Sequence, residues 1–277
     1  MNGVYALMEK LLPFSFLQYT FMKNALLAIV LITPVFGMLG TMAVDNKMAF
    51  FSDALGHSAL TGVAIGVILG MQDQMIPMLV FGALWAVLIT FVKQHSRMSA
   101  DTIISVFSSA SIALGLVILS RGGAFAKYSS LLVGDVLSVT EKDLPLLLCT
   151  LVVVFTCWCF LFNPLLLTSV NASLARSRGI QTKLTEYGFT VLVALCVMIS
   201  IRWVGVMLIN SLLILPAAAS RNLAKNAKGY LWTSVLIAFV CGISGLILSY
   251  YLNTSAGAAI VLLCTFVYFV TLPFRRK

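Results

Sequence analysis

Charged residues are scarce in this sequence, and their scarcity excludes a soluble fold. Asp, Glu, Lys and Arg make up 10% of the 277 residues, whereas hydrophobic residues make up 61%. A soluble domain has about 25% charged and about 45–50% apolar residues, and it needs the polar ones to cover its surface. The apolar residues here form long uncharged blocks, and the mean hydropathy is +1.05. This pattern predicts an all-α fold, a polytopic bundle of transmembrane helices that forms one domain over residues 1–277.

Several catalytic motifs are also missing. The sequence has no Gly-Lys-Ser or Gly-Lys-Thr phosphate loop, so it cannot hydrolyse ATP by that machinery. It has no His-Glu-x-x-His or Gly-x-Ser-x-Gly motif, which argues against an intramembrane enzyme. Its six cysteines include no Cys-x-x-Cys pair for zinc or redox chemistry. We therefore expect a membrane protein that is not itself an enzyme, in which any use of ATP falls to a partner chain.

About nine segments are long and apolar enough to approach the length of about 20 residues that a membrane-spanning helix needs. The candidate spans are 25–44, 48–71, 75–92, 102–120, 144–162, 187–201, 203–219, 230–252 and 256–274. The two spans that flank Arg202 are short, so they are either two tilted helices or one broken element. The sequence therefore predicts nine spans, or eight if these two merge.

The net charge of +9 is explained by membrane orientation rather than by nucleic-acid binding. The cations lie in short loops, and no basic stripe with aromatic stacking partners is present. Because Lys and Arg accumulate in cytoplasmic loops, we place the C-terminus inside the cell. The predicted cytoplasmic cations are Lys47, Lys93, Arg97, Arg176, Arg178, Lys183, Arg221, Lys225, Lys228, Arg275, Arg276 and Lys277, and the outer ones are Lys10, Lys23, Arg121, Lys127, Lys142 and Arg202. Nine spans place the N-terminus outside and eight place it inside.

The second predicted span contains the best candidate for a metal site. Asp53 and His57 are four residues apart, so a helix places the carboxylate and the imidazole on one face. Ionisable groups inside membrane spans cost about 2.5–3.5 kcal/mol each, so they usually mark a pathway or a site. A carboxylate with an imidazole suits Mn²⁺ or Zn²⁺, although two ligands are an incomplete shell. The alternative is that the two side chains only hydrogen-bond each other, or that Asp53 caps the helix.

Other polar residues within the spans are weaker candidates. Asn210 and Ser211 precede Pro216, where a helix could open and expose carbonyl groups to a transport pathway. The serines near Ser108 can bond back to their own helix. Asp101 and Glu186 lie at predicted cytoplasmic ends of spans, where helix capping is expected.

Two stretches together resemble a known family, the membrane permeases of bacterial zinc and manganese ATP-binding-cassette importers, also called the ABC-3 type. Residues 36–41 and 47–66 follow that family's signature of Asp-Ala, two variable residues, His-Ser and then Gly-Val, with Thr61 where many relatives have proline. Residues 172–180 are similar to the coupling helix of these permeases, which has the form Ala-x-x-x-Gly-Ile or Gly-Val. Residues 129–135 and 213–218 also match at corresponding places, so the resemblance covers the chain from about residue 14 to its end.

The resemblance implies an ATP-driven importer of Mn²⁺ or Zn²⁺ in the bacterial cell membrane, working by alternating access. It implies a homodimer of this chain, two cytoplasmic ATP-binding subunits and an extracellular or periplasmic metal-binding protein. By the same analogy Asp53 and His57 coordinate the transported metal. The implied ATPase contact consists of Ala172, Ala175, Arg176, Arg178, Gly179 and Ile180.

A secondary metal-ion transporter or channel without an ATPase is the alternative. Such a protein would more naturally carry several intramembrane acids for ion coupling than the single Asp53 found here.

Overall fold

The computed structural model describes residues 15–121 and 134–274, together with Tyr5 and Met8, and of Ser15, Phe16 and Arg121 it describes only the backbone. These residues form helices and no strand. The elements are η1 (Ser15–Gln18), α2 (Thr20–Asp45), α3 (Phe51–Ile68), α4 (Met75–His95), α5 (Ala100–Arg121), η2 (Val136–Ser138), α8 (Leu144–Val170), α9 (Ala172–Ser177), α10 (Thr182–Leu223), α11 (Ala227–Leu252), α12 (Ala256–Thr271) and η3 (Leu272–Phe274). Eight of the described helices are long and apolar enough to cross a membrane. The predicted all-α transmembrane bundle is confirmed.

Some predicted features lie outside the described residues. They are the cations Lys10, Lys127, Arg275, Arg276 and Lys277, the side chain of Arg121 and most of the 129–135 match to the family. Among the described spans the largest difference in a boundary is at the end of α8. This helix was predicted to end at residue 162 but continues through Pro164 to Val170, so only Asn171 separates it from α9.

Helix α10 contains both of the spans predicted around Arg202. Its 42 residues would extend for about 63 Å as a straight helix, twice the thickness of the hydrocarbon core of a membrane. The helix is interrupted at Gly205, whose φ of 78° and ψ of 161° are not helical. Gly134 packs against this point so closely that a Cβ on it would lie 2.2 Å from the Gly205 nitrogen. The sequence suggested a break at Arg202, and the structure places it three residues later, at Gly205.

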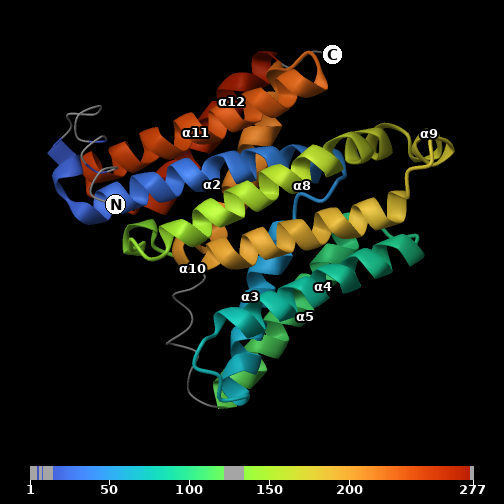
Figure 1. The fold of residues 1–277 in the computed structure, drawn as a ribbon, viewed down its shortest axis with the longest axis horizontal. Coiled ribbons are helices and arrows are strands. Elements are labelled where there is room, and N and C mark those ends of the chain that lie inside the picture. Colours follow the sequence, from blue (N-terminus) through green and yellow to red (C-terminus); the bar gives the residue numbers. More distant parts are fainter. Residues whose placement is uncertain (1–4, 6–7, 9–14, 122–133, 275–277) are drawn as a thin grey trace.

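The contacts of the two halves of α10 show that the chain reverses direction at Gly205. Glu186, near the start of α10, pairs with Lys93, near the end of α4. Arg221, near the end of α10, pairs with Asp45 at the end of α2. Helices α2 and α4 end on the same side of the molecule, the side that carries α9 (Figure 1). Helix α10 thus begins and ends on that side, and the eight long helices make nine passes.

The nine passes decide the orientation of the N-terminal helix. The start of α2 and the end of α12 lie at opposite ends of the bundle (Figure 1). The predicted cytoplasmic cations Lys93, Lys183 and Arg221 lie near α9, at the end of the bundle where the chain also ends. With that end in the cytoplasm, α2 begins outside.

Helix α3 begins inside the bundle because the turn before it is tight. Lys47 has a left-handed φ of 56°, and the Met48 nitrogen donates to the Ala43 carbonyl, as in a Schellman motif at a helix end. Met48 and Phe51 are fully buried and fix the turn against the core. Figure 1 shows α3 starting near the middle of the long axis of the molecule. The first turn of α3, with Asp53, therefore lies well inside the membrane-spanning bundle.

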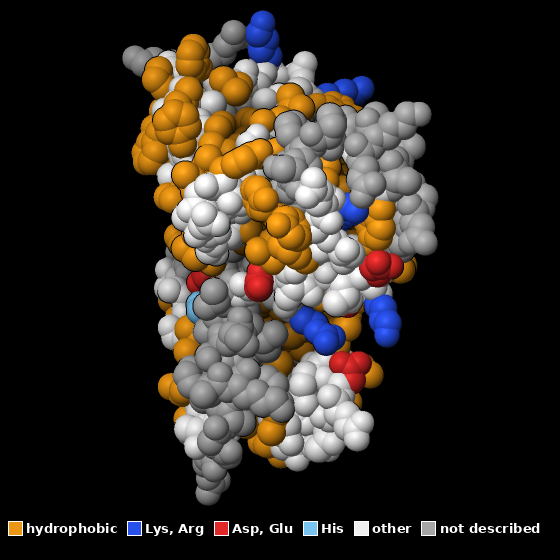
Figure 2. Space-filling view, turned by 90° about the vertical axis from the view of Figure 1, so that its left-hand side faces the viewer, with side chains coloured by type: hydrophobic (Ala, Val, Ile, Leu, Met, Phe, Trp, Pro, Cys, Tyr) orange, Lys and Arg blue, Asp and Glu red, His pale blue; other side chains and the backbone are white. Residues whose placement is uncertain are grey.

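The most buried of the long helices are α2, α3 and α10, and the others surround them. The outer helices carry exposed large hydrophobic side chains along their length, as lipid contact requires. Figure 2 views the end of the bundle opposite α9, where hydrophobic side chains gather in the upper part of the view and charged ones are scattered. The chain is a multi-pass protein of the cell membrane.

Candidate functional site

Asp53 and His57 lie together in the first two turns of α3, as their spacing predicted. The His57 Nε2 atom is 3.5 Å from the Asp53 Oδ2 atom. The side chain of Asp53 is 42% exposed and that of His57 is 26% exposed, so neither is sealed in the core. Because α3 begins inside the bundle, this ionisable pair lies among the membrane-spanning helices rather than in a loop between them.

Asn210 joins the pair from the second half of α10. Its Nδ2 atom donates a hydrogen bond of 2.8 Å to the Asp53 Oδ1 atom. Its own oxygen, Oδ1, is buried and has no hydrogen-bond partner among the described residues. The predicted companion, Ser211, is half-buried and donates to the Met207 carbonyl of its own helix. The structure therefore brings Asn210 to the pair and not Ser211.

Two glycines of α3 let neighbouring helices approach this site. A Cβ on Gly56 would lie 2.3 Å from the Cγ1 atom of Val206, so only glycine allows α3 to lie this close to α10. A Cβ on Gly62 would lie 2.7 Å from the Met78 Cα atom of α4. These contacts indicate a packing role for the small residues of α3.

A cavity of about 180 Å³ opens beside Asp53. It is lined by Phe50, which directly precedes α3, by Asp53 of α3 and by Asp101, Ile104, Ser105 and Ser108 of α5. From the sequence, Asp101 was predicted to cap a helix and the serines to bond to their own helix, so their place in the lining of this cavity was not predicted. The signal was the spacing of the polar residues 101, 105 and 108, which a helix places on one face. Asp101 lies in the first turn of α5, at the same end of the bundle as the end of α4.

The predicted coupling helix is α9. Asn171 caps it, because its Oδ1 atom accepts hydrogen bonds from the Ser173 and Leu174 nitrogens. It ends in a Schellman motif, in which Gly179 has a φ of 78° and the Ile180 nitrogen donates to the Ala175 carbonyl. This motif explains why the sequence needs glycine four residues after Ala175.

One face of α9 is exposed at the end of the bundle. Ala175 is fully buried and holds the helix against the bundle. Of the other predicted residues, Ala172 of α9 is half-buried, and Arg176 of α9 and Arg178, directly after it, are exposed. The neighbouring Val170, Leu174 and Leu184 expose apolar side chains at the same end of the molecule.

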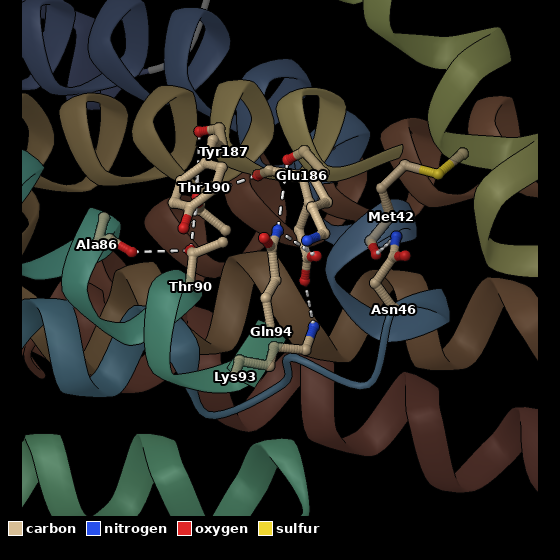
Figure 3. Close-up of polar contacts among 10 residues, drawn as sticks. Met42, Asn46, Ala86, Thr90, Lys93, Gln94, Glu186, Tyr187 and Thr190 are labelled. Carbon is tan, nitrogen blue, oxygen red and sulfur yellow. Dashed lines mark hydrogen bonds and ion pairs between the residues drawn. The ribbon is translucent and has the colours of Figure 1, made fainter. Parts of the chain in front are cut away.

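A polar network ties α10 to α4 close to α9. The Lys93 Nζ atom is 2.7 Å from the Glu186 Oε1 atom, and the Gln94 Nε2 atom donates to Glu186 Oε2 at 3.1 Å. Deeper in the bundle, the Thr90 hydroxyl donates to the Thr190 hydroxyl at 2.9 Å. Figure 3 shows Lys93 and Gln94 of α4 pointing at Glu186 of α10. Glu186 was predicted to be a helix cap and is instead one half of an ion pair between helices.

The described residues contain no group of three or more His, Cys, Asp and Glu side chains that could hold a metal ion. Any ion at Asp53 and His57 must therefore complete its ligand shell with other groups.

Comparison with known proteins gives one family over nearly the whole chain. The profile of the ABC 3 transport family matches residues 18–275. The manganese import system permease protein ScaB of Streptococcus parasanguinis is 33% identical over 263 residues, which are 94% of each chain. The high-affinity zinc uptake system membrane protein ZnuB of Haemophilus influenzae is 30% identical and covers 91% of this chain and 97% of its own. In a solved structure of PsaBC from Streptococcus pneumoniae with a Fab, one chain is 29% identical with a TM-score of 0.78, over 98% of this chain and 95% of that one.

Proposed function

Because this chain belongs to the ABC 3 transport family, we propose that it is the permease subunit of an ATP-driven importer of divalent transition-metal ions, manganese or zinc. Its relatives ScaB and ZnuB are named for manganese import and zinc uptake. The whole chain, residues 1–277, acts as one permease domain. The observation that carries the proposal is the contact of Asp53, His57 and Asn210 inside a bundle of apolar helices.

The transported ion binds to Asp53 and His57. The carboxylate and the imidazole act as ligands and replace part of the hydration shell of the ion. The site must release the ion inward, so its affinity has to be moderate. The cavity beside Asp53 supports this role, because it gives the carboxylate access to space for a hydrated ion.

The permease works as a homodimer. The side chain of Asp53 is 42% exposed in the isolated chain although α3 starts inside the bundle. Lipid cannot cover a carboxylate without a large cost in free energy. A second copy of the chain can cover it and enclose a pathway that the two copies share.

ATP is bound and hydrolysed by separate cytoplasmic subunits that dock on α9. The exposed arginines of α9 and the exposed Leu174 supply both charge and apolar area for such a contact. An extracellular or periplasmic metal-binding protein delivers the ion at the outer end of the bundle. Movement of α9 on ATP binding and hydrolysis then alternates access to Asp53 and His57 between the two sides.

Uptake of radiolabelled Mn²⁺ and Zn²⁺ tests this proposal. The permease is expressed with its ATPase and its metal-binding protein in a host without other importers. We expect ATP-dependent uptake of one ion that Asp53→Asn and His57→Ala abolish at equal membrane abundance. His95→Ala is the matched control, because His95 is the second of the two histidines and is exposed at the cytoplasmic end of α4. Uptake that persists without the ATPase would instead support a secondary transporter.

A further inference from the structure

The donor set at the metal site is incomplete without a third side chain. Asp53 and His57 supply one carboxylate and one imidazole, and the described residues add no His, Cys, Asp or Glu to them. A divalent transition ion takes four to six ligands, and water fills only the positions that the protein leaves open. The side chain that contacts Asp53 from another helix is Asn210.

The spacing of the polar atoms fits one shared ion. Metal–ligand bonds of about 2.1 Å place neighbouring ligands about 3.0 Å apart in an octahedron and about 3.4 Å apart in a tetrahedron. The Asn210 Nδ2 atom is 2.8 Å from Asp53 Oδ1, and the His57 Nε2 atom is 3.5 Å from Asp53 Oδ2. Asn210 and His57 thus each lie beside a different oxygen of the Asp53 carboxylate, at the separation that neighbouring ligands have when one ion binds both of those oxygens.

The amide oxygen of Asn210 is a buried acceptor without a partner. Burying an amide oxygen without a hydrogen bond costs about 1–3 kcal/mol, so proteins rarely leave one in this state. Half a turn of the amide about its terminal bond exchanges its oxygen and nitrogen. The oxygen then occupies the position beside the Asp53 carboxylate, where a cation satisfies both groups.

We propose that Asn210 is the third protein ligand of the transported ion and binds it through the Oδ1 atom. This inference rests on the proposed function, in which Asp53 and His57 bind the ion. In the empty site Asn210 donates to Asp53, and in the loaded site its amide has turned and its oxygen coordinates the metal. The ligand set of two oxygens and one nitrogen favours Mn²⁺ over softer ions. The bound ion also links α3 to the second half of α10, directly after the reversal at Gly205.

A cysteine at position 210 tests the ligand role by direct spectroscopy. A thiolate that coordinates Cd²⁺ gives a sulfur-to-metal charge-transfer absorption in the ultraviolet and shifts affinity toward soft ions. We titrate the purified permease–ATPase complex of Asn210→Cys with Cd²⁺ and Mn²⁺. Ser211→Cys is the matched control, because this neighbouring residue is half-buried like Asn210 but bonds to its own helix and not to Asp53. The native cysteines are common to both variants and to the wild type.

The expected result for Asn210→Cys is a new charge-transfer band and a ratio of Cd²⁺ to Mn²⁺ affinity raised about tenfold or more. Ser211→Cys gives neither. Identical spectra and affinity ratios in the two variants overturn the ligand role and leave Asn210 as a residue that only positions Asp53. If Asn210→Cys does not assemble, Asn210→Asp and Asn210→Leu replace it. A ligand role predicts Mn²⁺ binding retained by the carboxylate and lost with leucine, whereas a role as hydrogen-bond donor predicts loss in both.

The same titration separates the inference from the proposed function. His57→Ala must abolish Mn²⁺ binding if the proposed site is correct. Loss of binding in His57→Ala without a band in Asn210→Cys refutes only the third ligand, whereas Mn²⁺ binding unchanged in His57→Ala refutes the site itself.

Discussion

The substitution Gly56→Ala adds one methyl group at the contact between α3 and α10. Its Cβ would lie 2.3 Å from the Val206 Cγ1 atom and 2.9 Å from Cγ2, whereas ordinary contact begins at 3.4 Å. Valine is stiff at χ1, so its methyl groups cannot turn away, and the helices must separate by about 1 Å. This shift lengthens the 2.8 Å hydrogen bond between Asn210 and Asp53 to about 4 Å, beyond hydrogen-bonding distance.

The cost follows from the size of this overlap. Overpacking by one methyl group costs about 1–3 kcal/mol. Where this cost raises the free energy of the metal-bound state, it lowers the affinity for Mn²⁺ by about 5- to 150-fold. We expect Gly56→Ala to weaken Mn²⁺ binding within this range in titrations of the purified complex. The double variant Gly56→Ala/Val206→Ala removes both methyl groups and should restore most of the affinity.

Gly188→Ala is the control for the added methyl group. The nearest atom to its Cβ is 3.7 Å away, so alanine fits there, and it should slightly stabilise the helix. Wild-type Mn²⁺ affinity in Gly56→Ala would refute the reasoning, because it would mean that the site does not depend on the close approach of α3 to α10.

Three further predictions concern the cytoplasmic half of the protein. Glu186→Lys should lower the amount of metal imported per ATP hydrolysed, because the new lysine repels Lys93 across the α4–α10 contact. Adding Lys93→Glu should restore this ratio. Equal loss in the single and double variants would show that the pair does not link the helices. Leu174→Glu should prevent copurification of the ATPase, since it places a carboxylate in an apolar docking surface. Leu174→Met keeps the side chain apolar and should not prevent it. Full retention of the ATPase by both variants would show that the ATPase does not dock at Leu174 of α9. Asp101→Asn should slow ion release more than ion binding, because it removes a negative charge from the lining of the cavity. Single-turnover uptake measures both rates. An unchanged release rate would exclude Asp101 from the pathway.

The parts of the fold that depend on local sequence could be predicted. Long apolar blocks locate the spans, because each must match the thickness of the bilayer whatever it packs against. The pairing of Asp53 with His57 follows from their spacing on one helix. The Schellman motif after Ala175 follows in the same way from one local glycine, Gly179.

The parts that depend on long-range packing could not be predicted. The chain reverses at Gly205 rather than at the charged Arg202, because the Gly134 backbone packs there from a distant segment. Glu186 pairs with Lys93, which is 93 positions away in the sequence, so no local pattern predicts this ion pair. Asn210 was predicted only as part of a polar pair before a proline. Its contact with Asp53 requires both the tight turn before α3 and the reversal of α10.

The most direct test of the central claim is the position of the metal in a structure of the Mn²⁺-loaded complex, found by anomalous scattering at the manganese edge. The account predicts one anomalous peak per permease chain, about 2.2 Å from an Asp53 carboxylate oxygen and from the His57 Nε2 atom. A peak elsewhere in the bundle, with Asp53 and His57 still 3.5 Å apart and unliganded, would contradict it.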